Sequence, residues 1–394
     1  MLLSRFREQL QSSEWAERER VPRTAGLAIL QAIAVRVDSK VAPDASDIDM
    51  ARAVVDTLPH NATSRALGEL LRVIGADPPS PAGPALMAYG KALQDDGAYE
   101  LAADVYQLAA ELGRREQALK LAPAALVRVG ACLRSLGRHK EAIKAYRAAA
   151  AVAQEIGDRV EELMAHTGLA KVAIAQDKYP AARKELSRVI DAAREEDLRY
   201  PLGLALHDRG SLGNREGDLE SALLDLSESI RVQRDRSEQI RVLGDVGVTL
   251  RHLGLFDIAR DVFACVRNES PELEMQTTAT INLLQVAADL RQWDEFDRWR
   301  ANLEATTLRP YRLCEFLETL GENLVLRGFE HESRTAYHAL RDTARQFEFH
   351  EFERLAERAL DGVHVSEPTP QRTEPLPWRC RPALDVIRET VLSR

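Results

Sequence analysis

The sequence lacks several features that mark common classes of protein. Only 5% of its 394 residues are aromatic, and its four cysteines lie far apart without a CxxC or Cys/His spacing. We therefore expect reduced thiols rather than disulfides or a zinc site. No window approaches the roughly eighteen apolar residues that a membrane span needs. The opening stretch, MLLSRFREQLQSSEWAERER, lacks an uninterrupted apolar segment. We expect no secretory signal, and a soluble, cytoplasmic protein.

Motifs for catalysis are missing as well. The sequence contains no GxxxxGK[ST] phosphate loop, no GxGxxG after a strand, no GxSxG elbow and no HExxH. The nearest pair of histidines on one predicted helix, His331 and His338, is seven residues apart, which does not favour a metal site. We predict no enzyme, with no catalytic residue, no metal and no cofactor.

Charge of one sign does not dominate the chain. Lys and Arg number 53 against 62 Asp and Glu, which gives a net charge of −9. No global basic field is present to attract nucleic acid or an anionic membrane, so neither is expected as a partner. The composition, 45% hydrophobic and 29% charged, suits packed helices.

A repeat organises most of the sequence. In Leu86–Ala109, a small residue is followed seven residues later by a turn residue, twelve later by a second small residue and sixteen later by a large one. The pattern recurs with spacings of 40, 40, 40, 37, 37 and 37 residues, starting from Gly90, Gly130, Ala170, Gly210, Gly247, Leu284 and Gly321. So regular a period predicts an array of helical hairpins.

The repeated residue types suggest how each hairpin packs. Glycine inside a helix costs about 1 kcal/mol relative to alanine, so its recurrence indicates close contact between the two helices. Turn glycines such as Gly97 end the first helix at positive φ. Large residues such as Tyr106 are placed to wedge between neighbouring units. The sixth unit is irregular, because Phe296 replaces the small residue of its second helix.

The stretches LGRHKEAIKAYRAA, DGAYELAADVYQLA, EGDLESALLDLSES and LGLFDIARDVFACV resemble the second half of tetratricopeptide repeats. The units here are 37–40 residues long, compared with about 34 in that family. Lengthened repeats of this kind also occur in bacterial peptide-sensing regulators and in scaffolds. The resemblance implies an all-α, right-handed α-solenoid of about seven hairpins with helical caps at both ends.

The expected organisation has six parts. They are an N-terminal helical cap (1–75), a Pro-rich joint (76–84), the array (85–345), a capping helix (346–362), a Pro-rich flexible linker (363–381) and a short C-terminal helix (382–394). An alternative for 1–75 is a helix-turn-helix DNA reader, although Arg65 and Arg72 alone would face the phosphates. The C-terminal helix could dock on the end of the array, tether a partner or a second copy, or fray.

In tetratricopeptide arrays the first helices line a concave groove, and residues beside the repeated small positions face it. From this resemblance we predict a peptide-binding groove formed by Lys91, Arg128, Arg134, Lys171, His207, Asn214, Arg241, Arg251, Asn282 and Gln285. The last unit is acidic through Glu315, Glu318 and Glu322. This pattern favours a partner with acidic groups near its centre and a basic end. Alternatively, these residues form salt bridges between repeats, such as Arg241 with Asp208, and bind nothing.

The function we expect is therefore that of a non-enzymatic scaffold or adaptor that binds a protein or peptide. The alternative is a signal-responsive regulator, in which a bound peptide changes a second contact made by residues 1–75. Neither the identity of the partner nor the oligomeric state follows from the sequence.

Overall fold

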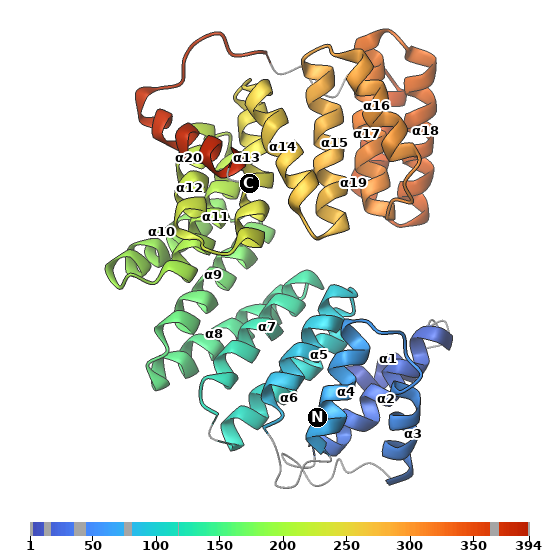
Figure 1. Ribbon diagram of the computed structural model, residues 1–394, viewed down its shortest axis with the longest axis vertical. Helices are drawn as coiled ribbons and strands as arrows, with labels where there is room; N and C mark the ends of the chain where they lie inside the picture. Colours follow the sequence, from blue (N-terminus) through green and yellow to red (C-terminus); the bar gives the residue numbers. More distant parts are fainter. Residues whose placement is uncertain are drawn as a thin grey trace. The chain divides into compact units, whose positions relative to one another are not determined.

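The computed structural model describes residues 3–11, 17–34, 45–74, 81–116, 118–362 and 370–392. All regular elements in these ranges are helices, which confirms the all-α class predicted from the repeat (Figure 1). The chain divides into two compact units, residues 1–201 and 202–394. None of the described helices is long and apolar enough to cross a membrane.

Unit 1 begins with four helices that precede the repeats. These are α1 (Ser4–Gln11), α2 (Glu17–Ala34), α3 (Ala45–Val55) and α4 (Ala62–Ile74). Three helical hairpins follow, and the second helix of each packs against the first helix of the next where both lie in this unit. They are α5 (Gly83–Asp95) with α6 (Tyr99–Arg115), α7 (Leu121–Ser135) with α8 (His139–Ile156), and α9 (Arg159–Ala175) with α10 (Tyr179–Glu195).

Unit 2 continues the series with four more hairpins. They are α11 (Arg199–Glu216) with α12 (Leu219–Val232), α13 (Arg236–His252) with α14 (Phe256–Glu269), α15 (Leu273–Asp289) with α16 (Trp293–Glu304), and α17 (Pro310–Arg327) with α18 (Glu330–Gln346). The first of them begins with α11, whose first three residues belong to unit 1. Helix α19 (His350–Leu360) then packs against α18. Within each unit, consecutive hairpins stack on one another, as expected for the solenoid-type array that the repeat predicted (Figure 1).

The repeated glycines lie against the repeated large side chains. A Cβ added at Gly90 would come within 2.6 Å of the Tyr106 ring, so only glycine allows that ring to cover the first helix. Tyr146 does the same at Gly130, and its ring also lies against Gly168 of the next hairpin. Tyr146 thus wedges between two consecutive hairpins, as the sequence predicted.

The hairpin turns follow the predicted chemistry. Gly97 and Gly254, for example, have φ values of 77° and 72°, in the left-handed region that glycine adopts at low cost. Asp177 replaces glycine in the third hairpin and takes a φ of 56°. In the irregular sixth unit, the buried Phe296 ring contacts Trp293 edge-on, with ring centroids 5.8 Å apart. The buried Phe296 thus stands where the regular hairpins have alanine.

The C-terminal part of the chain differs from the expected flexible linker. Residues 363–369 of that linker lie outside the described residues. Residues 370–377 have no regular secondary structure and lead into a 3-10 turn (Trp378–Cys380) and α20 (Arg381–Leu392). Leu376 and Cys380 are buried. Helix α20 packs against α12 and α14, which belong to the first two hairpins of unit 2, rather than on the last hairpin.

Candidate functional site

A cavity of about 300 Å³ lies in unit 2, among helices of four consecutive hairpins. Helices α11, α13, α15 and α17 contribute to it as first helices of their hairpins, and α14 closes it from behind. We call it the unit 2 pocket, and it is lined by His207, Arg241, Gly244, Asp245, Val248, Phe263, Val266, Glu272, Glu274, Met275, Thr278, Ala279, Asn282 and Arg312. Three of the predicted groove residues, His207, Arg241 and Asn282, therefore share one cavity.

The pocket is apolar over part of its wall. Phe263 and Val266 of α14 and Ala279 of α15 are buried, and Val248 and Met275 are half-buried beside them. Gly244 of α13 lies in the same wall, and a Cβ added there would meet no atom within 4 Å. Unlike Gly90, then, Gly244 is not required by helix packing.

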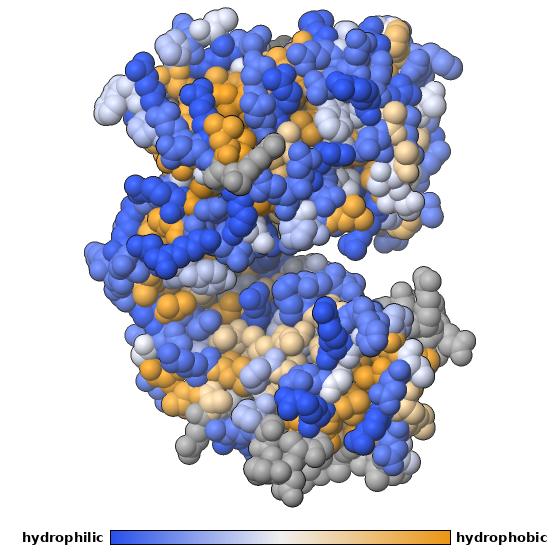
Figure 2. Space-filling view, viewed as in Figure 1, coloured by the Kyte–Doolittle hydropathy of each residue, from blue (hydrophilic) through white to orange (hydrophobic). Residues whose placement is uncertain are grey.

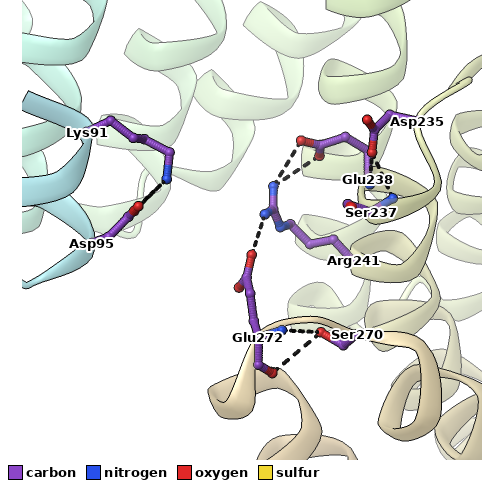
Figure 3. Close-up of polar contacts among 8 residues, drawn as sticks. All are labelled: Lys91, Asp95, Asp235, Ser237, Glu238, Arg241, Ser270 and Glu272. Atoms are coloured by element: carbon purple, nitrogen blue, oxygen red, sulfur yellow. Dashed lines mark hydrogen bonds and ion pairs between the residues drawn. The ribbon is translucent and has the colours of Figure 1, made fainter. Parts of the chain in front are cut away.

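Ion pairs flank the apolar wall on one side (Figure 3). The Arg241 guanidinium donates to Glu238 at 3.0 Å, within its own helix, and to Glu272 at 3.1 Å, at the start of the next hairpin. Asp235 caps α13 by accepting hydrogen bonds from the backbone amides of Ser237 and Glu238. The Arg241 and Glu272 side chains are 43% and 55% exposed, so water and a ligand can both reach this pair.

A second group of charges lies on the α15–α17 side. The Arg312 side chain donates to Glu274 at 3.2 Å and to Glu315 at 2.5 Å. Both pocket arginines thus have carboxylate partners. An incoming acidic group would have to share or replace those partners.

Asp245 links two first helices at the pocket. Its carboxylate lies 2.9 Å from His207 Nε2 and accepts a hydrogen bond from Ser211. Burial raises the pKa of Asp245, but the hydrogen bonds from His207 and Ser211 and the charge of His207 outweigh burial and lower it overall. The carboxylate is consequently ionised at neutral pH, which adds a negative charge to the wall.

Three other predicted groove residues, Asn214, Arg251 and Gln285, do not line the pocket, and their side chains contact the next hairpin. Asn214 accepts a hydrogen bond from Thr249 at 2.8 Å. Arg251 donates to Asp289 at 3.5 Å, and that carboxylate is only 3% exposed. These are contacts of the kind that the alternative interpretation expected.

Gln285 also contacts the next hairpin through its side-chain amide. Its amide donates to Asp289 at 3.0 Å, and its carbonyl oxygen accepts from Asn323 at 2.8 Å. Asn323 is fully buried, so this pair satisfies polar groups inside the array. Arg241, the residue named in the alternative, pairs with Glu238 and Glu272.

The remaining predicted groove residues lie in unit 1. Lys91 pairs with Asp95 one turn along α5, at 2.5 Å, and both side chains are exposed. Arg128 is exposed and Arg134 is half-buried on α7, where Arg134 Nε has no hydrogen-bond partner in the described part of the chain. Lys171 is half-buried on α9.

Sequence reasoning missed the residues that complete the pocket. Glu272 lies in the connection before α15, outside the helical stripe from which the groove was predicted. Glu274 and Arg312 are separated by 38 residues, close to the repeat period, and this spacing could have indicated a contact between neighbouring hairpins. Across the described ranges, no cluster of three or more His, Cys, Asp or Glu residues is arranged to hold a metal ion.

Comparisons with known proteins match parts of the repeat array to two family models. A tetratricopeptide repeat model matches residues 121–195, and a model for anaphase-promoting complex subunit 5 matches residues 170–243. The first of these matches spans the second and third hairpins, α7 to α10, and supports the resemblance of the repeats to tetratricopeptide repeats. A search of curated proteins finds no significant match to the sequence.

Solved structures similar to the chain include three helical-repeat proteins. A Rap protein complexed with competence and sporulation factor is 13% identical, with a TM-score of 0.48, over 88% of this chain and 98% of that one. NprR in complex with its cognate peptide NprX is 14% identical, with a TM-score of 0.48, over 86% and 91%. A tetratricopeptide repeat protein from Parabacteroides merdae is 14% identical, with a TM-score of 0.45, over 71% and 100%.

Proposed function

We propose that the protein is a non-enzymatic scaffold or sensor, located in the cytoplasm, that binds a peptide segment of its partner in the unit 2 pocket. The observation that carries this proposal is a cavity with an apolar wall and charged edges, assembled from first helices of successive hairpins. Apolar pockets with a few polar groups are the usual form of a ligand site.

The size of the pocket limits what it can take. Its volume of about 300 Å³ is at the lower end of the range for small-molecule sites, which extends from about 300 to 1,000 Å³. It therefore holds one or two side chains of a peptide rather than a folded surface. The half-buried Val248 and Met275 would contact an aliphatic or aromatic side chain of that peptide.

Arg241 offers an acidic group a contact beside that anchor. The Arg241–Glu272 pair is exposed, and pairs of this kind contribute only about 0.2–1 kcal/mol. A ligand carboxylate can thus replace Glu272 on the Arg241 guanidinium at small cost, because it exchanges one charge-assisted hydrogen bond for another. We propose Lys91, Arg128, Arg134 and Lys171 of unit 1 as contacts for other parts of the same partner.

Filling the pocket tests the proposal directly. A library of random displayed peptides is selected on the immobilised full-length chain, and the dissociation constant of a selected peptide is measured by fluorescence anisotropy. Gly244→Leu places a side chain in the pocket where a Cβ meets no atom within 4 Å, and leucine favours the helix more than glycine does. We expect at least tenfold weaker binding with no loss of stability.

The matched control is Gly68→Leu in α4. Gly68 is also a helical glycine whose Cβ would meet no atom within 4 Å, but it lies in unit 1. This variant should bind the peptide as the unaltered protein does. Failure to select any peptide, or full affinity in Gly244→Leu, would overturn the proposal.

A specific observation in unit 1 supports the regulator alternative. A mostly apolar cavity of about 640 Å³ lies between α2 and α3, and Met50 beside it is 62% exposed. An effector contact here should be lost in Met50→Glu while peptide affinity at the unit 2 pocket is unchanged. If an effector captured from the host binds Met50→Glu normally, this second function is excluded for that surface.

A further inference from the structure

The C-terminal segment, residues 370–392, is held on unit 2 by an apolar face. Leu376, Cys380, Ala383 and Ile387 are all buried there, and each is 6% exposed or less. Ala383 and Ile387 are four residues apart and so lie on one side of α20, whereas Leu376 and Cys380 precede the helix. A helix as short as α20 is marginal in water by itself, so its structure depends on this docking. Figure 2 shows apolar surface around the end of α20, where Leu392 is 77% exposed.

Polar contacts fix the beginning of the segment. The backbone amide of Arg372 donates to the Gly254 carbonyl at 3.1 Å, in the turn between α13 and α14. A Cβ at Gly254 would lie 2.6 Å from Arg372 N, so this turn accepts the segment only because it carries glycine. Arg379 then pairs with Glu220 of α12 at 2.6 Å.

Arg236 fixes the other end of the segment. It is the first residue of α13, and its Nη1 donates to the Thr390 carbonyl of α20 at 3.1 Å. The same guanidinium donates to Glu269, the last residue of α14, at 2.7 and 3.0 Å. One side chain therefore connects α13, α14 and the C-terminal segment.

Two of the helices that hold the segment, α13 and α14, also line the unit 2 pocket. Arg241 lies five residues after Arg236, and its partner Glu272 lies three residues after Glu269. Phe263 of α14 lines the pocket and belongs to the same apolar cluster as the buried residues of the segment. No residue of the segment lines the pocket itself, so the segment does not occupy the ligand's place.

We propose that docking of residues 370–392 holds α13 and α14 in the geometry that binds the peptide, so that release of the segment weakens binding. This inference rests on the proposed function, because the regulated site is the unit 2 pocket. Because coupling between two sites is reciprocal, peptide binding also strengthens docking of the segment. Couplings of this kind typically change affinity by about 5- to 150-fold.

Ile387→Asp tests the proposal in the full-length chain. It places a charge at a fully buried position of α20 and should release the segment. The matched control is Leu392→Asp, the same type of substitution at an exposed position of the same helix. Cys380 reports release directly, because its thiol is buried in the docked state and becomes open to a maleimide reagent. Labelling is located by mass spectrometry.

The expected result is fast labelling of Cys380 and about tenfold weaker peptide binding in Ile387→Asp, with neither change in Leu392→Asp. In the unaltered protein, saturating peptide should slow the labelling of Cys380. If Cys380 becomes reactive while the peptide affinity stays the same, the coupling is refuted and the proposed function stands. If Cys380 stays protected in Ile387→Asp, the double variant Ile387→Asp/Ala383→Asp is used to release the segment. Weaker peptide binding in that variant supports the coupling, and unchanged binding with a reactive Cys380 refutes it.

A readout without peptide separates this inference from the proposed function. Met275→Cys introduces a thiol in the half-buried wall of the pocket, and its labelling rate reports the pocket's openness. We expect release of the segment by Ile387→Asp to change this rate at least threefold. An unchanged rate would refute the coupling even if no peptide had been found.

Discussion

Glu318 of α17 makes the stability of unit 2 depend on pH. Burial, together with the negative charges of Glu322, Glu315 and Glu351, raises its pKa from 4.5 to about 7. The first two of these charges lie on the same helix and Glu351 lies on α19, which packs against it. Ionising Glu318 in the folded protein therefore places a fourth negative charge in a half-buried cluster.

The sign of the effect follows from the direction of the pKa shift. Between about pH 4.5 and 7, the folded protein holds a proton on Glu318 that the unfolded chain has released. The contribution of Glu318 to stability is thus present at low pH and is lost as the pH rises through about 7. A shift of this size corresponds to at most about 3 kcal/mol.

Glu318→Gln removes this dependence, because glutamine has nearly the same size and no charge. We expect the variant to unfold at a higher urea concentration than the unaltered protein at about pH 8, by up to about 3 kcal/mol. At about pH 5 the two proteins should differ little. Glu389→Gln on α20 controls for the loss of one exposed negative charge. An equal gain at both pH values, or none at pH 8, would refute the reasoning.

Two further predictions concern the packing of the array. Tyr146→Ala should destabilise unit 1 by about 3–5 kcal/mol, because its buried ring fills the space beside both Gly130 and Gly168. Urea unfolding measures this loss of stability. A loss below 1 kcal/mol would contradict the role of Tyr146 in packing two hairpins together. Asp225→Ala should cost about 3–5 kcal/mol in thermal unfolding, since it leaves Arg209 without the carboxylate that accepts two hydrogen bonds of 2.7 Å. Asp225→Asn, which keeps one acceptor, should cost less.

The hairpins could be predicted because their packing leaves a local signature. Gly90 must be small for the Tyr106 ring to cover it, and the same constraint recurs in each regular unit. A period of 37–40 residues therefore marks where each hairpin begins. The irregular sixth unit was visible for the same reason, since Phe296 breaks the pattern.

The candidate site could be predicted only in part. His207, Arg241 and Asn282 were found because they lie beside the repeated small positions of their helices. Glu272 and Arg312 were not, because one lies in a connection and the other meets the pocket only through stacking of two hairpins. The helical stripe shows which side chains face outward from a helix, but not which of them the next hairpin engages.

The place where the C-terminal segment docks could not be predicted from the sequence, for a different reason. Its proline-rich beginning is typical of a solvated linker, and the short helix after it has no repeat partner. What holds it is an apolar face of the segment, the backbone of one hairpin turn at Gly254, and a side chain, Arg236, about 150 residues away in the sequence. Contacts of this kind do not recur along the chain, so a repeat pattern cannot reveal them.

Arg251 shows why the position of a residue beside the groove is not enough to assign binding. Reversing its charge would leave the Asp289 carboxylate, which is 3% exposed, facing a second negative charge. Weaker partner binding by such a variant would then report damage to the array. Gly244 is the opposite case, because its replacement changes the pocket and breaks no contact. The positions that the fold does not need are therefore those at which ligand binding can be tested without disturbing the fold.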